Sequence, residues 1–125
     1  MIPSLPNYPA GFCHHADAES TSRGARRLSA GQNKRLALAR LGLQDAPLWL
    51  LDEPTEALDA ATADDVLQRL SQHAHGRSLL IATHLRREAA LADRLICLQA
   101  GHIVADVRRG SAEFDAVLHT LRADG

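Results

Sequence analysis

The chain has few aromatic residues and only one lysine. Aromatic side chains make up 3% of its 125 residues, and every positive charge other than Lys34 is an arginine. These arginines are scattered and the net charge is −1. Neither a basic stripe that could follow a phosphate backbone nor an aromatic platform for stacking bases can be drawn. The composition therefore predicts no nucleic-acid partner.

Long apolar runs are missing as well. The longest, if Pro47 is counted, is Ala46 to Leu51, whereas a membrane-spanning helix needs roughly 20 apolar residues. We therefore expect no direct insertion into a membrane. The start of the chain does not read as a secretory signal, because no basic start and apolar core follow Met1.

The two cysteines, Cys13 and Cys97, lie in dissimilar surroundings far apart in the sequence, so no disulfide is implied. Cys13-His14-His15 could contribute to a metal site. However, adjacent residues do not easily converge on one ion and no fourth ligand is placed. A solvated segment is the favoured interpretation there. Cys97 follows an apolar pattern and is expected to be a small core residue.

Residues 1–25 differ in character from the rest, with several prolines and a Ser/Thr cluster. We expect a flexible leader, left unassigned, followed by a structured part over residues 26–125. Two explanations stay open for the leader: an altered reading of a longer gene, or an unrelated flexible segment.

The most informative stretch runs from Leu48 to Asp59. Its apolar half ends in Asp52 and Glu53, and Pro54 then prevents further strand pairing. The pattern predicts a buried strand that delivers both carboxylates to its C-terminal edge. In open α/β sheets ligands bind at that edge. Paired carboxylates there suit a magnesium ion and the activation of water.

Two further elements surround this strand. Upstream, Ser29 and Gly31 stand at the start of a predicted helix, where unpaired N–H groups and the helix dipole attract a phosphate oxygen. Downstream, residues 79–83 form a second predicted buried strand that ends at His84. Asp59 is interpreted as the N-cap of the next helix, which does not prevent it from also facing a neighbouring subunit.

Near the end of the chain, the apolar pattern and Gly101 predict a strand over residues 92–98, a tight turn, and a second strand over residues 100–104. Ser111 then opens a helix whose apolar face includes Phe114. A hairpin followed by a helix is therefore expected.

These elements, in this order, resemble the second half of an ATP-binding cassette (ABC) ATPase domain. By this resemblance Leu28 to Gln32 is the signature loop and Glu56 to Asp59 the D-loop. The residues that it assigns to nucleotide are Ser29, Gly31, Gln32 and Asp59, with Asp52 as the magnesium ligand, Glu53 polarising the attacking water, and His84 sensing the γ-phosphate. Ala30 departs from the usual Leu-Ser-Gly-Gly-Gln, and its methyl group can hinder close phosphate approach or a positive φ.

The resemblance also implies a fold and its incompleteness. We expect an α/β, three-layer parallel sheet of the P-loop NTPase type that lacks the Walker A strand, with a C-terminal hairpin and helix. No G-x-x-x-x-G-K-[ST] pattern is present, and Lys34 lies just after the signature-like loop. Because the missing strand belongs inside the sheet, we expect marginal stability or dependence on a partner chain.

The function implied is the ATP-binding and hydrolysing portion of an exporter, inactive alone and working with ATP, Mg²⁺, a second cassette and a transmembrane subunit or domain. Its place would be the cytoplasmic face of the bacterial inner membrane. Glu56, residues 35–40 and residues 45–51 together resemble the CydC family of thiol exporters. That family moves glutathione and cysteine and supports cytochrome bd assembly. Two alternatives stay open: a non-enzymatic module that docks on an intact cassette, or a fragment of a DNA-maintenance ABC ATPase.

Overall fold

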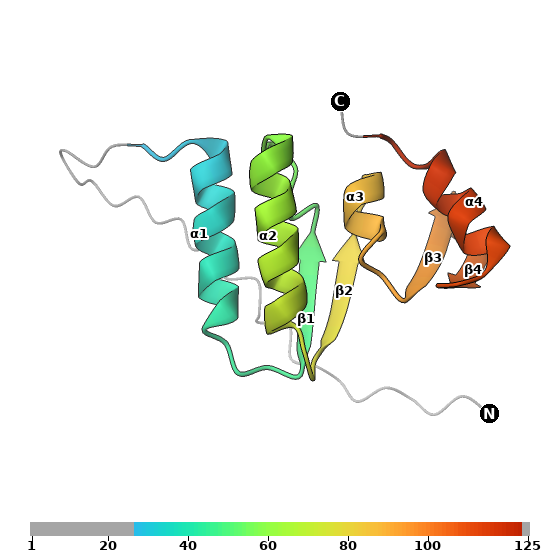
Figure 1. Ribbon diagram of the computed structural model, residues 1–125, viewed down its shortest axis with the longest axis horizontal. Helices are drawn as coiled ribbons and strands as arrows, with labels where there is room; N and C mark the ends of the chain where they lie inside the picture. Colours follow the sequence, from blue (N-terminus) through green and yellow to red (C-terminus); the bar gives the residue numbers. More distant parts are fainter. Residues whose placement is uncertain (1–26, 124–125) are drawn as a thin grey trace.

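The structure is a computed structural model that describes residues 27–123, so the predictions for the leader, including Cys13, His14 and His15, lie outside the described residues. Helices and strands alternate along the first half and a hairpin and helix follow, as the sequence predicts (Figure 1). The elements are α1 (Ala30–Gly42), β1 (Leu48–Asp52), α2 (Ala60–His73), β2 (Ser78–Ala82), α3 (Arg86–Ala89), β3 (Arg94–Gln99), β4 (His102–Arg108) and α4 (Ala112–Thr120).

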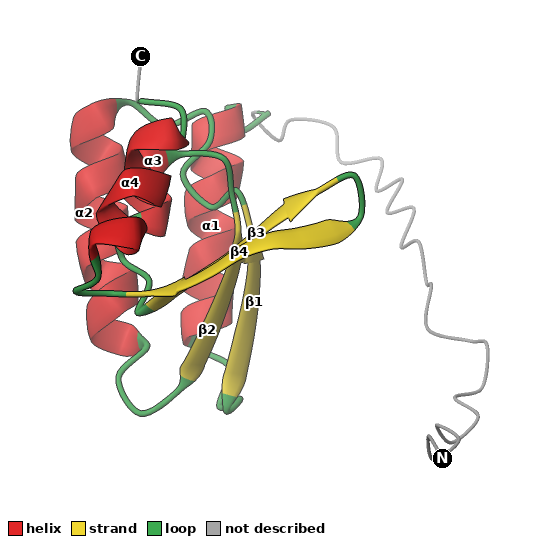
Figure 2. Ribbon diagram, turned by 90° about the vertical axis from the view of Figure 1, so that its right-hand side faces the viewer, coloured by secondary structure: helices red, strands yellow, loops and turns green. Residues whose placement is uncertain are grey.

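The described strands form two separate pairs. β1 and β2 are parallel, with Leu48 opposite Ser78 and Asp52 opposite Ala82. β3 and β4 are antiparallel, and the hairpin strands run at a steep angle to β1 and β2 (Figure 2). In Figure 1, α3 lies between β2 and the hairpin. The expected α/β fold with a parallel sheet is therefore confirmed, and among the described strands no pairing joins β2 to β3.

Each long helix begins at the residue that the sequence marks as its cap. The Ser29 hydroxyl accepts a hydrogen bond from the backbone of Gln32, whose own side chain accepts from the backbone N–H of Ser29. The side chain of Asp59 caps α2 by accepting from the backbone N–H of Thr62, and that of Ser111 caps α4 by accepting from the backbone N–H of Phe114. Such bonds satisfy N–H groups that have no partner inside the helix, which explains why these helices start where they do.

The core lies on one face of the parallel pair only. Trp49 of β1 is 2% exposed, and it is buried together with Ala63, Leu67 and Leu70 of α2. The guanidinium of Arg77 lies 4.7 Å from the centre of the Trp49 ring. A second buried group joins α3 to α4 and consists of Leu85, Ala89 and Phe114.

The opposite face of the pair is open, and the expectation of two buried strands is wrong there. Leu50 is 64% exposed and Leu80 is 60% exposed, because among the described residues no element covers their side of the sheet. Parallel strands are normally covered on both faces. Cys97 is likewise half-buried rather than part of a core.

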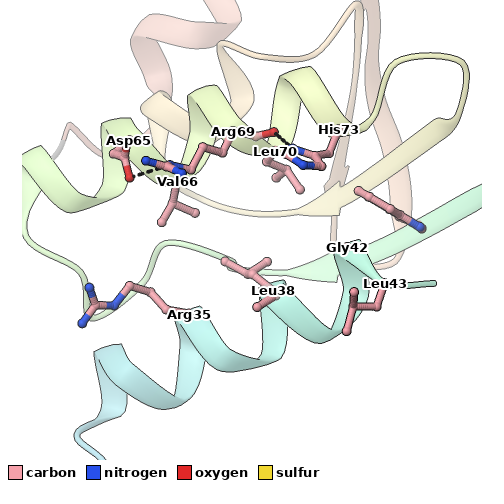
Figure 3. Close-up of a pocket in the computed structure, with 11 residues that line it drawn as sticks. Arg35, Leu38, Gly42, Leu43, Asp65, Val66, Arg69, Leu70 and His73 are labelled. Carbon is pink, nitrogen blue, oxygen red and sulfur yellow. Dashed lines mark hydrogen bonds and ion pairs between the residues drawn. The ribbon is translucent and has the colours of Figure 1, made fainter.

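A groove of about 370 Å³ separates α1 from α2 (Figure 3). Leu38 lines it from α1 and Leu43 from the position directly after α1, and Val66 and Leu70 line it from α2. No residue of α1 is fully buried, and Leu43 is 87% exposed. The helix that carries the signature-like sequence is therefore less firmly packed than α2. No helix within residues 27–123 is both long and apolar enough to cross a membrane.

We expect the two faces of the sheet to respond very differently to truncation. Leu67→Ala, at a side chain that is 5% exposed, should lower the free energy of unfolding by about 2 to 4 kcal/mol. Leu80→Thr on the open face should change it by less than about 0.5 kcal/mol. Urea unfolding followed by circular dichroism measures both. Equal losses for the two variants would contradict a one-sided core.

Candidate active site at the carboxyl ends of β1 and β2

The parallel register brings the predicted acidic and histidine residues to one edge. Asp52 pairs with Ala82 at the last step of the ladder, and the backbone N–H of Glu53 donates to the Ala82 carbonyl at 2.9 Å. The chain then leaves β1 through a turn in which Glu53 has φ 44° and Ala57 has φ 67°. Left-handed backbone at residues other than glycine costs roughly 1 kcal/mol or more, so this turn must be held by its surroundings.

Glu53 and His84 are in direct contact. The distance between Glu53 Oε1 and His84 Nδ1 is 2.5 Å, and the two side chains remain partly open to solvent. Because the carboxylate accepts, the proton of this bond belongs to Nδ1, which leaves Nε2 of the imidazole available to another group. The contact joins the two residues that sequence reasoning predicted to be catalytic.

A second carboxyl group sets the protonation of Glu53. The side-chain hydrogen bond with Glu56 is the largest cause of a lowered pKa for Glu53; burial, the next largest effect, opposes the lowering, and His84 and Lys34 lower the pKa further. The same bond raises the pKa of Glu56, because two neighbouring carboxyl groups do not ionise together easily. Glu53 is therefore the carboxylate of the pair, and Glu56 holds the proton longer as the pH rises.

Asp52 lies beside this pair and is exposed. Its backbone oxygen accepts a long hydrogen bond of 3.4 Å from Nζ of Lys34 in α1. Within residues 27–123, no three His, Cys, Asp or Glu side chains are grouped closely enough to hold a metal ion. Asp52 therefore fits a magnesium ion only as one of several ligands, the others being water and phosphate oxygens.

The signature-like residues occupy the start of α1 rather than the edge of the sheet. Ser29 and Gln32 are engaged with each other in the helix cap. Gly31 faces the turn before α2, where an added Cβ would lie 3.2 Å from Leu58 Cδ2. Ala30 is the first residue of α1, and the positive φ angles of the described non-glycine residues lie elsewhere. Within residues 27–123, the side-chain bonds of Ser29 and Gln32 are to each other, whereas Glu53 bonds to His84.

Asp59 acts as the cap that the sequence predicts. Its Oδ2 accepts from the backbone N–H of Thr62 at 3.0 Å and its Oδ1 from the Thr62 hydroxyl at 2.6 Å. The hydroxyl is the largest cause of a lowered pKa for Asp59, followed by the backbone N–H. A role opposite a neighbouring subunit stays a prediction.

Hydrogen bonds connect the segment that carries His84 to the C-terminal part of the chain. The backbone N–H of Arg122 donates to the His84 carbonyl at 3.1 Å. The side chain of Arg86 donates to the carbonyls of Leu118, His119 and Leu121. Carbonyls at the end of a helix lack partners within it, so a cation is well placed there.

Sequence reasoning missed three residues of this region. Thr55 and Glu88 are completely buried and hydrogen-bonded to each other, and Arg87 contacts the same threonine. Glu88 stands in a four-residue helix, too short for a periodic pattern to mark its buried face. The only available signal was its position four residues after His84.

A model of the ABC transporter family matches residues 11–56, and the match begins within the segment left unassigned above. The chain corresponds to part of an ABC transporter ATP-binding domain.

Three curated relatives have comparable similarity. The glutathione/L-cysteine transport system ATP-binding/permease protein CydC of Escherichia coli is 43% identical over 81 residues, 65% of this chain and 14% of that protein. The macrolide export ATP-binding/permease protein MacB of Rhodospirillum rubrum is 42% identical over 102 residues, 76% of this chain and 16% of that protein. The Nod factor export ATP-binding protein I of Rhizobium meliloti is 41% identical over 110 residues, 86% of this chain and 31% of that protein. The chain thus spans less than a third of each of these relatives.

A solved structure supports the fold. It is described as "Structural biochemistry of ATP-driven dimerization and DNA stimulated activation of SMC ATPases", and it matches with a TM-score of 0.56 and 22% identity. The match covers 74% of this chain and 60% of that chain. At this identity the likeness shows a common fold and does not transfer a function.

The cap at α2 predicts a specific pH dependence. We expect Asp59 to titrate below its ordinary value of 3.8, and Thr62→Val to bring its pKa back up because the hydroxyl is the main cause of the lowering. Carbon-detected NMR titration of the carboxyl groups measures this. A lowered pKa in the folded state stabilises the protein above the unfolded pKa, and this stabilisation is lost as the pH falls through the folded value.

Thr62→Ser is the matched control, since it keeps the hydroxyl and should keep the low pKa of Asp59. If Thr62→Val and Thr62→Ser titrate alike, the hydroxyl is not the cause of the lowering.

Proposed function

We propose that this chain supplies three parts of an ATP-hydrolysing cassette in an ABC exporter. They are the signature loop (Leu28 to Gln32), the Walker B strand (Leu48 to Asp52) and the switch histidine, His84, that senses the γ-phosphate. The observation that carries the proposal is the contact between Glu53 and His84 at the carboxyl edge of two parallel strands. A carboxylate and an imidazole at that edge suit a water molecule attacking a phosphate. The family match over residues 11–56 supports ATP and Mg²⁺ as the ligands.

In this proposal each side chain has a separate task. Glu53, whose low pKa keeps it ionised at neutral pH, accepts a hydrogen bond from the attacking water and orients it. His84 directs Nε2 toward the γ-phosphate, because Nδ1 is engaged by Glu53. Asp52 provides an exposed carboxylate for the magnesium ion that accompanies the triphosphate.

The residues outside this edge serve a second nucleotide. Ser29, Gly31 and Gln32 form the start of α1, where N–H groups without helical partners favour an anion. We propose that they contact a nucleotide bound to a second cassette, and that Asp59 lies close to the boundary between the two. That arrangement requires a partner cassette and a transmembrane subunit or domain, and it places the chain at the cytoplasmic face of a bacterial inner membrane.

The phosphate-binding loop must come from outside these 125 residues. No Gly-rich loop with lysine is present, and positioning and charge neutralisation of the triphosphate supply most of phosphoryl-transfer catalysis. Among the strands of residues 27–123, β2 and β3 each have one edge without a partner strand. We propose that the cassette is completed there.

The transported substrate is supported less strongly than the exporter class. CydC, MacB and the Nod factor protein are 41% to 43% identical over the aligned residues, and their names specify glutathione or cysteine, macrolides and Nod factor. Export is common to the three. Thiol export for cytochrome bd assembly rests on the CydC relatives and on the resemblance of Glu56 and of residues 35–40 and 45–51 to that family.

The isolated chain should not bind Mg-ATP measurably in calorimetry, because the main phosphate contacts are absent from it. Asp52→Asn should therefore give the same flat titration as the unmodified chain. Tight binding that Asp52→Asn abolishes would mean that the chain contains a phosphate cradle of its own, which would overturn the divided-cassette part of the proposal.

Completion of the cassette should restore hydrolysis. We expect ATPase activity when the chain is mixed with a polypeptide from a relative that carries the phosphate loop and its strand. Glu53→Gln should lower the rate at least about a hundredfold while leaving nucleotide binding intact, since it removes the negative charge that makes Glu53 a strong acceptor for a proton of the attacking water. Glu113→Gln, the same change at an exposed glutamate of α4, is the control for surface changes. A complex that forms, binds Mg-ATP and yet hydrolyses it equally well with Glu53→Gln would refute the role of Glu53. A stable complex that never binds nucleotide would favour the non-enzymatic docking module.

A further inference from the structure

Glu88 is a buried carboxyl group that the proposed mechanism does not use. It is 0% exposed, although it stands in a helix of only four residues. One of its oxygens, Oε1, accepts two hydrogen bonds from Thr55: from the backbone N–H at 2.6 Å and from the hydroxyl at 2.5 Å. Carboxyl groups are rarely fully buried unless they are paired, because burial removes their hydration. Glu88 is buried where one of its oxygens accepts two hydrogen bonds from the same residue, Thr55.

The neighbouring Arg87 holds the same residue from the other side. Its Nε donates to the Thr55 hydroxyl at 3.0 Å, and its NH2 group donates to the Thr55 carbonyl at 2.8 Å. The hydroxyl of Thr55 thus donates to Glu88 and accepts from Arg87 at the same time. With its N–H and carbonyl also bonded, every polar group of Thr55 is engaged by two consecutive residues of α3.

These bonds join the two loops that carry the candidate catalytic pair. Thr55 lies two residues after Glu53, and Glu88 lies four residues after His84. The ladder between the strands ends at Asp52 and Ala82, so it does not itself fix the loops beyond that point. Beyond the bond from the Glu53 N–H to the Ala82 carbonyl, the Thr55 bonds connect the two loops independently of the contact between Glu53 and His84.

The bonds to Thr55 stabilise the turn after β1, whose backbone is strained. Glu53 has φ 44° and Ala57 has φ 67°, and Thr55 lies between them, completely buried. Strained backbone of this kind persists only where the surrounding structure over-determines it. Without the bonds from α3, the turn is free to relax, and a shift of 1 Å at Glu53 breaks a hydrogen bond of 2.5 Å.

We propose that Glu88, acting through Thr55 and together with Arg87, is a positioning residue that sets the contact between Glu53 and His84. The catalytic meaning of that contact rests on the proposed function, but the geometric coupling does not. The coupling fixes which nitrogen of His84 carries a proton and therefore which nitrogen faces the substrate.

The test is ¹⁵N NMR of the histidine side chains in the full chain at one fixed pH near 8, without nucleotide. His84 is assigned by the signal that disappears in His84→Gln. In the unmodified chain we expect the proton on Nδ1, the nitrogen that donates to Glu53. Thr55→Val removes the hydroxyl that bridges Glu88 and Arg87, and we expect the Nδ1 proton signature of His84 to be lost. Glu88→Ala should have the same effect.

Two conservative variants separate positioning from folding. Thr55→Ser keeps the hydroxyl and Glu88→Gln keeps an oxygen acceptor, so both should retain or largely restore the His84 signature. Glu113→Gln, at an exposed glutamate of α4, is a control that should change nothing. If Glu88→Ala does not fold, as judged by circular dichroism, the Thr55→Val and Thr55→Ser pair decides the question.

The proposal is overturned if Thr55→Val folds and shows the His84 signature of the unmodified chain. It is also overturned if Thr55→Ser loses that signature as completely as Thr55→Val does. Since no nucleotide is used, either result is independent of whether the completed cassette hydrolyses ATP. If Thr55→Val removes the Nδ1 proton signature of His84 but the completed cassette does not hydrolyse ATP, the proposed function fails and the coupling between the two loops is still supported.

Discussion

The structure depends on the parallel register of β1 with β2. Asp52 opposite Ala82 is the pairing that brings the end of one strand level with the end of the other. Because side chains alternate between faces, a shift of one residue would turn Trp49 out of its place against α2 and would separate Glu53 from His84. The burial of Trp49 among the side chains of α2 therefore fixes the register, and the register fixes the site.

The same pair of strands explains why the core is one-sided. Leu67 and Leu70 of α2 cover one face, whereas Leu50 and Leu80 remain exposed on the other. The hairpin of β3 and β4 adds no cover, since it forms a separate pair held by its own contacts, including two hydrogen bonds between Arg94 and Asp106. An apolar surface of this kind is normally the inner face of a larger structure.

Local chemistry was predictable from the sequence, and long-range contacts were not. Ser29, Asp59 and Ser111 are confirmed as caps because a cap depends on residues three positions away. The strand over Leu48–Asp52 is confirmed as an element, but its burial on both faces was wrong because burial depends on elements that the local sequence does not contain. The contact between Glu88 and Thr55 spans 33 positions and has no local pattern. The roles of Ser29, Gly31, Gln32, Asp52, Glu53 and His84 remain predictions that their positions allow.

The anchoring of His84 by the end of the chain extends the site well beyond its motifs. Arg86 reaches three carbonyls at the end of α4, and Arg122 donates to the carbonyl of His84 itself. The short motifs by which the family is recognised run from Leu28 to His84, so they all precede α4 and Arg122 in the sequence. A homologue whose gene is interrupted after residue 110 would still be recognised as intact by a motif search, although its histidine would have lost the backbone that holds it. Sequence surveys that count functional cassettes by motif alone would then overcount them.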